Sequence, residues 1–114
     1  MNIEIFLEKL RNTPTLVAFT DTITVVDTHY NFTPTAFKNG DLLNEAGQNS
    51  GSCKLLAFSQ LQGLTQAETL ACFGQYYFID VLQDPNGTGH QNIRNFIKTG
   101  FEGLHFHGTP LTQK

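Results

Sequence analysis

The sequence lacks tryptophan, has only two cysteines and carries few charges, since Asp, Glu, Lys and Arg make up 15% of its 114 residues. The two cysteines, Cys53 and Cys72, are too few for a disulfide framework, and both lie in apolar segments. A reducing compartment is the expected setting for such thiols. The seven Lys and Arg residues are scattered, which excludes the clustered basic surface of a nucleic-acid-binding protein.

Long hydrophobic runs are also missing. No apolar stretch approaches the roughly 20 residues that a transmembrane helix needs. The N-terminus has no basic segment followed by an apolar one, so it does not resemble a secretory signal peptide. We therefore expect no membrane partner and no nucleic-acid partner.

What the sequence does have is aromatic mass, ten Phe and three Tyr, in a length that suits one domain over residues 1–114. The clearest pattern starts at Thr65, which forms a capping-box signature with Glu68. One long helix should follow, because the apolar residues after it recur at spacings of three and four. That stripe consists of Leu70, Phe73, Tyr77 and Val81.

A turn at 84–87 should end the long helix, because its sequence is Asp-Pro-Asn-Gly. A shorter helix over 90–98 is predicted next, with Ile93, Phe96 and Ile97 on its apolar side. Gly100 occupies the position after this helix, where a left-handed residue commonly ends a helix.

The rest of the chain predicts shorter elements. They are a helix over 2–11 and a helix over 15–29, with a strand as the alternative over the β-branched 22–28. Extended chain over 30–37, a turn at 39–40 and a loop over 41–51, with at most one helical turn at 42–46, come next. A helix capped by Ser52 should end near Gly63 and bury Leu55, Phe58 and Leu61, and a strand is predicted over 104–107. The predicted fold class is α+β: a single small domain, mostly helical, with a small sheet from 30–37 and 104–107.

A polar cluster lies at Asn49, Ser52, Cys53 and Lys54. If Ser52 caps a helix, Cys53 feels the positive end of the helix dipole, and Lys54 adds charge, so the thiol pKa should fall. With His90 as base, Cys53 would form a cysteine-nucleophile site. The alternative is that Cys53 is a small buried hydrophobe.

A second polar cluster opens the helix that begins near His90, and it includes Asn92 and Arg94. A helix N-terminus with a cation nearby can bind an anion. The alternative is that His90 or Asn92 caps the helix and Arg94 pairs with an acid such as Asp80 or Glu102.

His105 and His107 would point to the same side of a strand. Two imidazoles could bind zinc or nickel if His29 or a carboxylate came near. We expect the alternative, two solvent-facing histidines on an edge strand, and therefore no metal and no cofactor.

Three motifs in order resemble the HopJ type III effector family of Gram-negative bacteria, over about residues 19–111. They are Tyr30 to Gly40 (YNFTPTAFKNG), Asn44 to Lys54 (NEAGQNSGSCK) and His90 to Phe96 (HQNIRNF). Family members tend to have Asp where Gly89 stands and Trp where Phe101 stands. The resemblance implies an effector delivered into a host cell, but it carries over no catalytic residue.

Two hypotheses for function follow. The first is a small cytosolic binding or interaction domain whose ligand is a small anion or a protein, with Asn49, Ser52, Lys54, Asn92 and Arg94 as binding residues. The second is a hydrolase or transferase that uses the pair Cys53 and His90. We expect the first, because no strong catalytic spacing is present. We also expect a cytoplasmic protein, because the amphipathic pattern begins at Asn2 and leaves little chain for an export leader.

Overall fold

The structure is a computed structural model, and it describes residues 2–114. Its elements in chain order are α1 (Ile3–Asn12), η1 (Pro14–Leu16), α2 (Phe19–His29), β1 (Tyr30–Phe32), β2 (Phe37–Asn39), β3 (Leu42–Asn44), α3 (Ser50–Gln62), α4 (Gln66–Ala71), η2 (Tyr76–Val81), α5 (Gln91–Thr99), η3 (Gly100–Gly103), β4 (Leu104–Phe106) and β5 (Leu111–Gln113). Most of the regular structure is helical, and the strands are short, so the α+β prediction is confirmed.

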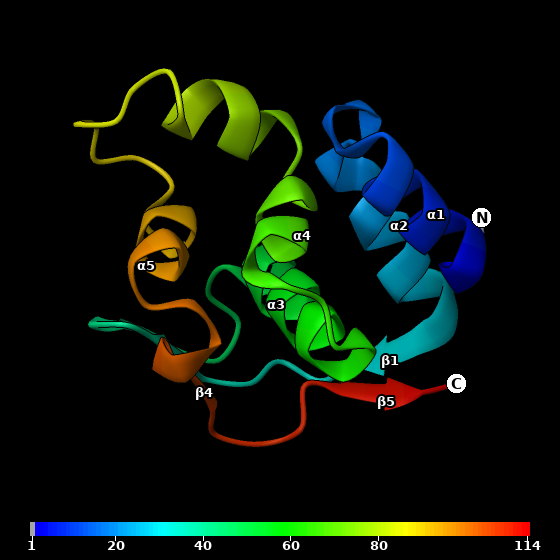
Figure 1. Cartoon of the computed structure of the whole chain (residues 1–114). Helices are drawn as coiled ribbons and strands as arrows, with labels where there is room; N and C mark the ends of the chain where they lie inside the picture. Colours follow the sequence, from blue (N-terminus) through cyan, green and yellow to red (C-terminus); the bar gives the residue numbers. More distant parts are fainter. Residues whose placement is uncertain (1) are drawn as a thin grey trace.

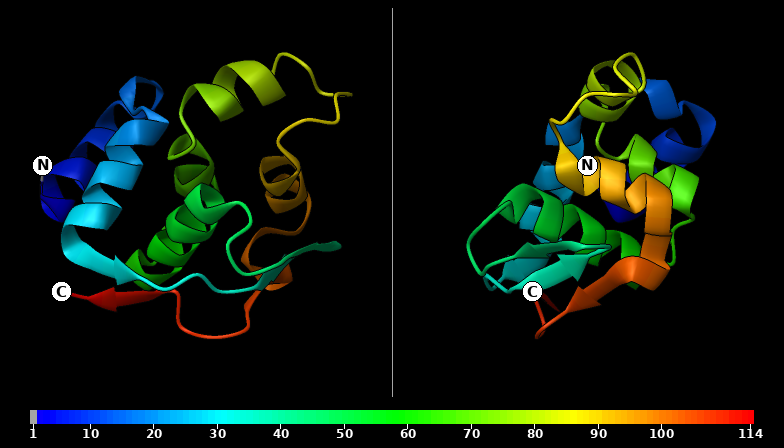
Figure 2. Two further views of the ribbon diagram at one scale, coloured as in Figure 1. Left: turned by 180° about the vertical axis from the view of Figure 1, so that it is seen from behind. Right: turned by 90° about the vertical axis from the view of Figure 1, so that its left-hand side faces the viewer.

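The helices form one layer, with α1 and α2 on one side, α3 and α4 in the middle and α5 on the other side (Figures 1 and 2). The contacts agree with this order, since α2 packs on α3 and α4 packs on α5. The strands lie along one edge of this layer, at the bottom of Figure 1. In residues 2–114 no helix is long and apolar enough to cross a membrane.

Two small antiparallel sheets join distant parts of the chain. β1 pairs with β5, so that Tyr30 faces Gln113, while β2 lies between β3 and β4, so that Phe37 faces both Asn44 and Phe106. The predicted sheet from 30–37 and 104–107 is therefore right only for the pairing of 37–39 with 104–106, since 30–32 pairs with 111–113 in a second sheet. The predicted helical turn at 42–46 is wrong, because Gly40 takes a left-handed conformation (φ +61°) and turns the chain back as a hairpin.

The core is rich in phenylalanine. The five that are essentially inaccessible to solvent are Phe6, Phe37, Phe58, Phe73 and Phe96. Leu55 is buried with Phe58 as predicted, but Leu61 is 59% exposed, so the prediction for Leu61 is wrong. The region 15–29 is an α-helix from Phe19 to His29, because Thr22, Val25 and Val26 at spacings of three and four turn inward together.

The long helix predicted from Thr65 is wrong, because the chain breaks at Gly74. The capping box is present at Thr65, but α4 stops at Ala71, and a stretch of π-helix, η2, resumes only at Tyr76. Gly74 has φ +61°, and a Cβ there would lie 2.8 Å from the backbone nitrogen of Phe19 and 2.9 Å from the carbonyl oxygen of Val17. Close approach of the segment before α2 therefore imposes the break.

Candidate functional site

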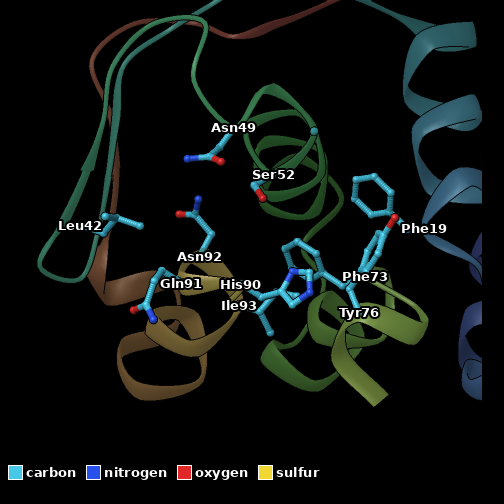
Figure 3. Close-up of a pocket in the computed structure, with 11 residues that line it drawn as sticks. Phe19, Leu42, Asn49, Ser52, Phe73, Tyr76, His90, Gln91, Asn92 and Ile93 are labelled. Atoms are coloured by element: carbon cyan, nitrogen blue, oxygen red, sulfur yellow. The ribbon is translucent and has the colours of Figure 1, made fainter. Parts of the chain in front are cut away.

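A cavity of about 450 Å³ lies where the starts of α3 and α5 meet η2 and β3 (Figure 3). The two polar clusters of the sequence meet here, since Asn49 and Ser52 come from one and His90 and Asn92 from the other. The full lining is Phe19, Leu42, Asn49, Gly51, Ser52, Phe73, Tyr76, His90, Gln91, Asn92 and Ile93. The cavity therefore joins segments about 40 residues apart in the chain.

One side of the cavity is aromatic. The rings of Phe19, Phe73 and Tyr76 gather there, while Asn49, Ser52 and Asn92 lie on the other side (Figure 3). Phe19 packs edge-on against Tyr76 at 5.3 Å between ring centroids. Gly51 lets this ring approach α3, because a Cβ at that position would lie 2.9 Å from the ring of Phe19. The cavity thus offers an apolar wall and a polar wall to one occupant.

A cluster of buried asparagines stands behind the polar wall. Asn44 and Asn92 exchange amide hydrogen bonds of 3.0 and 3.1 Å, and Asn39 donates to the backbone and side-chain oxygens of Asn92 at 2.8 and 3.0 Å. Asn49 at the cavity edge donates to Asn44 at 2.6 Å. These bonds tie β2, β3, α3 and α5 together. Asn92 therefore holds the fold around the cavity, and its amide is occupied by protein partners.

The starts of α3 and α5 differ from those of the other α-helices in residues 2–114. At α1, α2 and α4 a side-chain oxygen accepts a hydrogen bond from a first-turn or capping amide. The caps of α3 and α5 are Asn49 (φ +50°) and His90 (φ +55°), and neither side chain bonds to its own helix. These are also the only non-glycine residues with positive φ in that range. The prediction that Ser52 caps α3 is wrong, because the helix begins at Ser50.

His90 is held from two sides by η2. Its Nε2 lies 3.1 Å from Oδ2 of Asp80, and its ring lies 5.2 Å from the ring of Tyr76. The imidazole is about one-third exposed and lines the cavity. When Nε2 carries the proton that it donates to Asp80, Nδ1 is left as an acceptor. The contacts with η2 thus fix the orientation of the histidine in the cavity lining.

Cys53 is not part of the cavity lining. Its thiol is 1% exposed and lies 3.7 Å from the carbonyl oxygen of Thr35, to which it donates. Burial raises the pKa of the Cys53 thiol to about 11, against the weaker effect of that hydrogen bond. The predicted fall in the thiol pKa is therefore wrong. The reason is the position of Cys53, which is the fourth residue of α3 and faces the core rather than the open helix start.

Lys54 and Arg94 also lie outside the cavity. Lys54 pairs with Asp27 at 2.8 Å and lies over the ring of Phe32. Arg94 donates to the carbonyl oxygens of Gly89 and Asp84 at 2.6 and 2.8 Å. It therefore fastens the 84–89 loop to α5 instead of pairing with an acid as the alternative expected.

Sequence reasoning missed several residues of the site. Neither Phe19 nor Tyr76 was named as a site residue from the sequence, and Asp80 was named only as a partner for Arg94. The spacing of four between Tyr76 and Asp80 places both on one face of a helix, but nothing in the sequence places His90 against that face. His105 and His107 are exposed near the edge of the three-stranded sheet. No group of three or more His, Cys, Asp or Glu within residues 2–114 could hold a metal ion.

Comparisons with known proteins agree with the motifs. The family model described as HopJ type III effector protein matches residues 3–111. A solved crystal structure of an unknown function protein, VPA0580, is 46% identical and superimposes with a TM-score of 0.98, covering 100% of this chain and 95% of its own. No curated protein matches the sequence. Since the family model spans nearly the whole chain, the protein belongs to the HopJ type III effector family.

Proposed function

We propose that the protein is a small binding domain whose cavity holds a small anionic ligand with a flat apolar part. The observation that carries this proposal is the convergence of two uncapped helix starts, those of α3 and α5, on one cavity with an aromatic wall. In residues 2–114, α1 and α4 use the capping side chain to satisfy a first-turn amide, and in α2 the side chain of Asp21 accepts from the amide of the capping residue Ala18. The two that face the cavity leave that position open for an occupant.

The anionic part of the ligand would lie against the helix starts. The first amides of a helix have no acceptor within the helix, and the helix dipole adds partial positive charge there. α3 has 13 residues and α5 has nine, so both are long enough to present this field. Asp80 opposes an anion, but its carboxylate is directed at His90. Ser52 adds a side-chain hydroxyl donor beside these amides.

The flat apolar part would lie against Phe19, Phe73 and Tyr76. Aromatic rings pack favourably with a second ring, either offset or edge-on. A volume of about 450 Å³ suits a ligand of one or two rings. Lys54 and Arg94 do not line this cavity, so we no longer assign them to its ligand. Asn92 acts indirectly, because its hydrogen bonds hold the polar wall of the cavity in place.

An enzyme built on Cys53 and His90 has no support in this geometry. A thiol buried in the core with a raised pKa is a poor nucleophile at neutral pH. A Cys53→Ala variant should keep all ligand binding. If this substitution abolished binding or an activity without unfolding the protein, the cavity would not be the site.

We also propose a cytoplasmic location as an expectation to be tested. Two free, buried cysteines, Cys53 and Cys72, suit a reducing compartment. The family name implies instead that the protein is exported by type III secretion. A translocation reporter fused to the chain separates the two, because signal inside host cells that depends on the secretion system would contradict a resident protein.

The binding proposal is tested by NMR with defined probes. Benzoate and phenyl phosphate should shift the amides of Ser50 to Ser52 and of Asn92, while benzyl alcohol, which lacks the charge, should bind at least tenfold more weakly. Ser52→Phe should abolish binding by filling the cavity, and Ser52→Ala should weaken binding about tenfold by removing the hydroxyl donor. Leu61→Phe, on the exposed face of the same helix, is the matched control and should change nothing. Equal binding of the alcohol, or shifts outside the cavity, would refute the proposal.

A further inference from the structure

A groove of about 360 Å³ lies between η2 and α5, apart from the cavity described above. Its apolar lining consists of Val81, Leu82, Pro85 and Ile97. Leu82 is 50% exposed and Ile97 is 39% exposed, so two of the seven exposed large hydrophobic side chains in residues 2–114 lie in this one groove. Nothing in the described chain covers them.

The fold explains why these side chains stay exposed. Ile97 was predicted on the apolar side of its helix with Ile93 and Phe96, but the buried side of α5 consists of Ile93, Phe96 and the amide of Asn92. η2 forms the opposite side of the groove, because its π-helical path buries Val81 and leaves Leu82 at the surface. The turn at 84–87 closes one end of the groove. The groove is lined by residues of α5 between Gln91 and Lys98.

The charge at the rim of the groove is positive. Lys98 makes no ion pair or side-chain hydrogen bond to any residue of 2–114, and Arg94 donates to two backbone carbonyls rather than to a carboxylate. No acid is among the lining residues. The carboxylate of Asp84 and the guanidinium of Arg94 both lie against Gly87, which lines the groove. The negative charge of Asp84 thus offsets part of the positive charge of Arg94, and Lys98 is left as the unpaired cation of the groove.

We propose that this groove binds the alkyl chain of a medium-chain carboxylate, with the carboxylate at Lys98. In a protein of net charge −3, a groove that combines exposed aliphatic side chains with two cations and no lining acid selects a ligand with one negative end and an aliphatic tail. The tail lies along Leu82 and Ile97. This site is independent of the function proposed for the cavity.

The test is an NMR titration with octanoate, nonanoate and decanoate, each below the concentration at which it forms micelles. Shifts should appear in Val81, Leu82 and Ile97 to Thr99, and Gln91 is not a reporter because it lines both the groove and the cavity. Each added methylene should tighten binding by about fourfold while the groove can still cover it. Amine analogues of equal chain length should bind more weakly than the carboxylates.

Variants separate the carboxylate contact from the tail contact. Lys98→Gln should weaken decanoate about threefold at low salt and leave decanol unchanged, whereas Lys38→Gln, an exposed lysine on β2, should change neither. Leu82→Ser should weaken decanoate and decanol alike, with Leu61→Ser as its matched control. Asp84→Asn should tighten decanoate about twofold, because it removes the opposing charge.

Several outcomes would overturn the proposal. They are equal binding of decanoate and decylamine, an affinity that does not depend on chain length, and no response to Lys98→Gln. Shifts confined to Ser50 to Ser52 and Asn92 would place the ligand in the cavity instead. Failure of the benzoate titration would leave this test intact, because the reporter amides of the two sites differ.

Discussion

The start of α4 and the starts of α3 and α5 show two ways of beginning a helix. At α4, Thr65 accepts from the amide of Glu68 at 3.0 Å, and Glu68 accepts from the amide of Thr65 at 2.9 Å. At α3 and α5 the capping residues are left-handed and make no such bond. In the first kind, a side chain within four residues of sequence accepts from the first amides of the helix. In the second kind, the conformation of the capping residue depends on contacts from the rest of the fold.

The difference shows where a protein can leave polar groups open. A left-handed backbone costs a residue other than glycine about 1 kcal/mol, so Asn49 and His90 must be held by contacts from elsewhere. Asn49 is held through Asn44, and His90 through Asp80 and Tyr76. The stability of the open starts therefore comes from tertiary contacts behind the cavity, and their amides remain available in front.

The largest expected effect comes from removing that support. Asn92→Ala deletes the amide that bonds to Asn39 and Asn44, and it leaves the Asn44 side-chain nitrogen with only a 3.5 Å contact to the oxygen of Phe37. Loss of a buried bond together with an unsatisfied donor should lower the free energy of unfolding by about 2–3 kcal/mol. Urea denaturation followed by circular dichroism measures it.

The control for this variant is Asn31→Ala, on the exposed side of β1. It should change the free energy of unfolding by less than about 0.5 kcal/mol. If the two variants were equally stable, the asparagine cluster would not support the open helix starts, and their left-handed caps would need another explanation.

A smaller change in stability is expected when the hydroxyl of Thr65 at α4, or that of Ser52 at α3, is removed. Thr65→Ala removes the cap of α4 and should cost about 1 kcal/mol. Ser52→Ala should cost less than about 0.5 kcal/mol, because its hydroxyl makes no hydrogen bond in the described chain, but it should weaken benzoate binding. A stability loss of Ser52→Ala equal to that of Thr65→Ala would contradict the distinction between closed and open starts.

Sequence reasoning succeeded where the cause was local. The capping box at Thr65 and Glu68, the stop at Gly63 and the hairpin residue Gly40 all act within a few residues of chain, so their sequence signals were sufficient. The break at Gly74 was missed because its cause is the backbone at Val17 and Phe19, more than 50 residues earlier. A single glycine within an apolar helical stripe does not carry that information.

The same division applies to the site. Both polar clusters were predicted, but which of their members face the cavity depends on the true start of α3. Placing the cap at Ser52 instead of Asn49 shifts the helix by three residues, and this wrongly brought Cys53 to the exposed start. Asp80 and Tyr76 both reach His90 from η2, and this contact between two separate segments is not specified by any spacing in the sequence.

The smallest effect, and the sharpest test of the closed start, is its pH dependence. The backbone hydrogen bond from Thr65 is the main cause that lowers the pKa of Glu68 below its usual value, with a smaller contribution from Arg11. A carboxylate whose pKa is lowered in the folded state stabilises the fold above its unfolded pKa and loses that effect as pH falls through the folded pKa. Glu68→Gln should therefore lower the free energy of unfolding by about 0.5 kcal/mol at pH 7 and leave it unchanged well below pH 4.

Arg11→Gln separates the two causes, since it removes the exposed ion pair at 3.0 Å and keeps the capping box. Thermal melts of both variants across pH give the comparison, and a Glu68→Gln cost that stayed constant down to low pH would mean that the ionised carboxylate is not what closes this helix start.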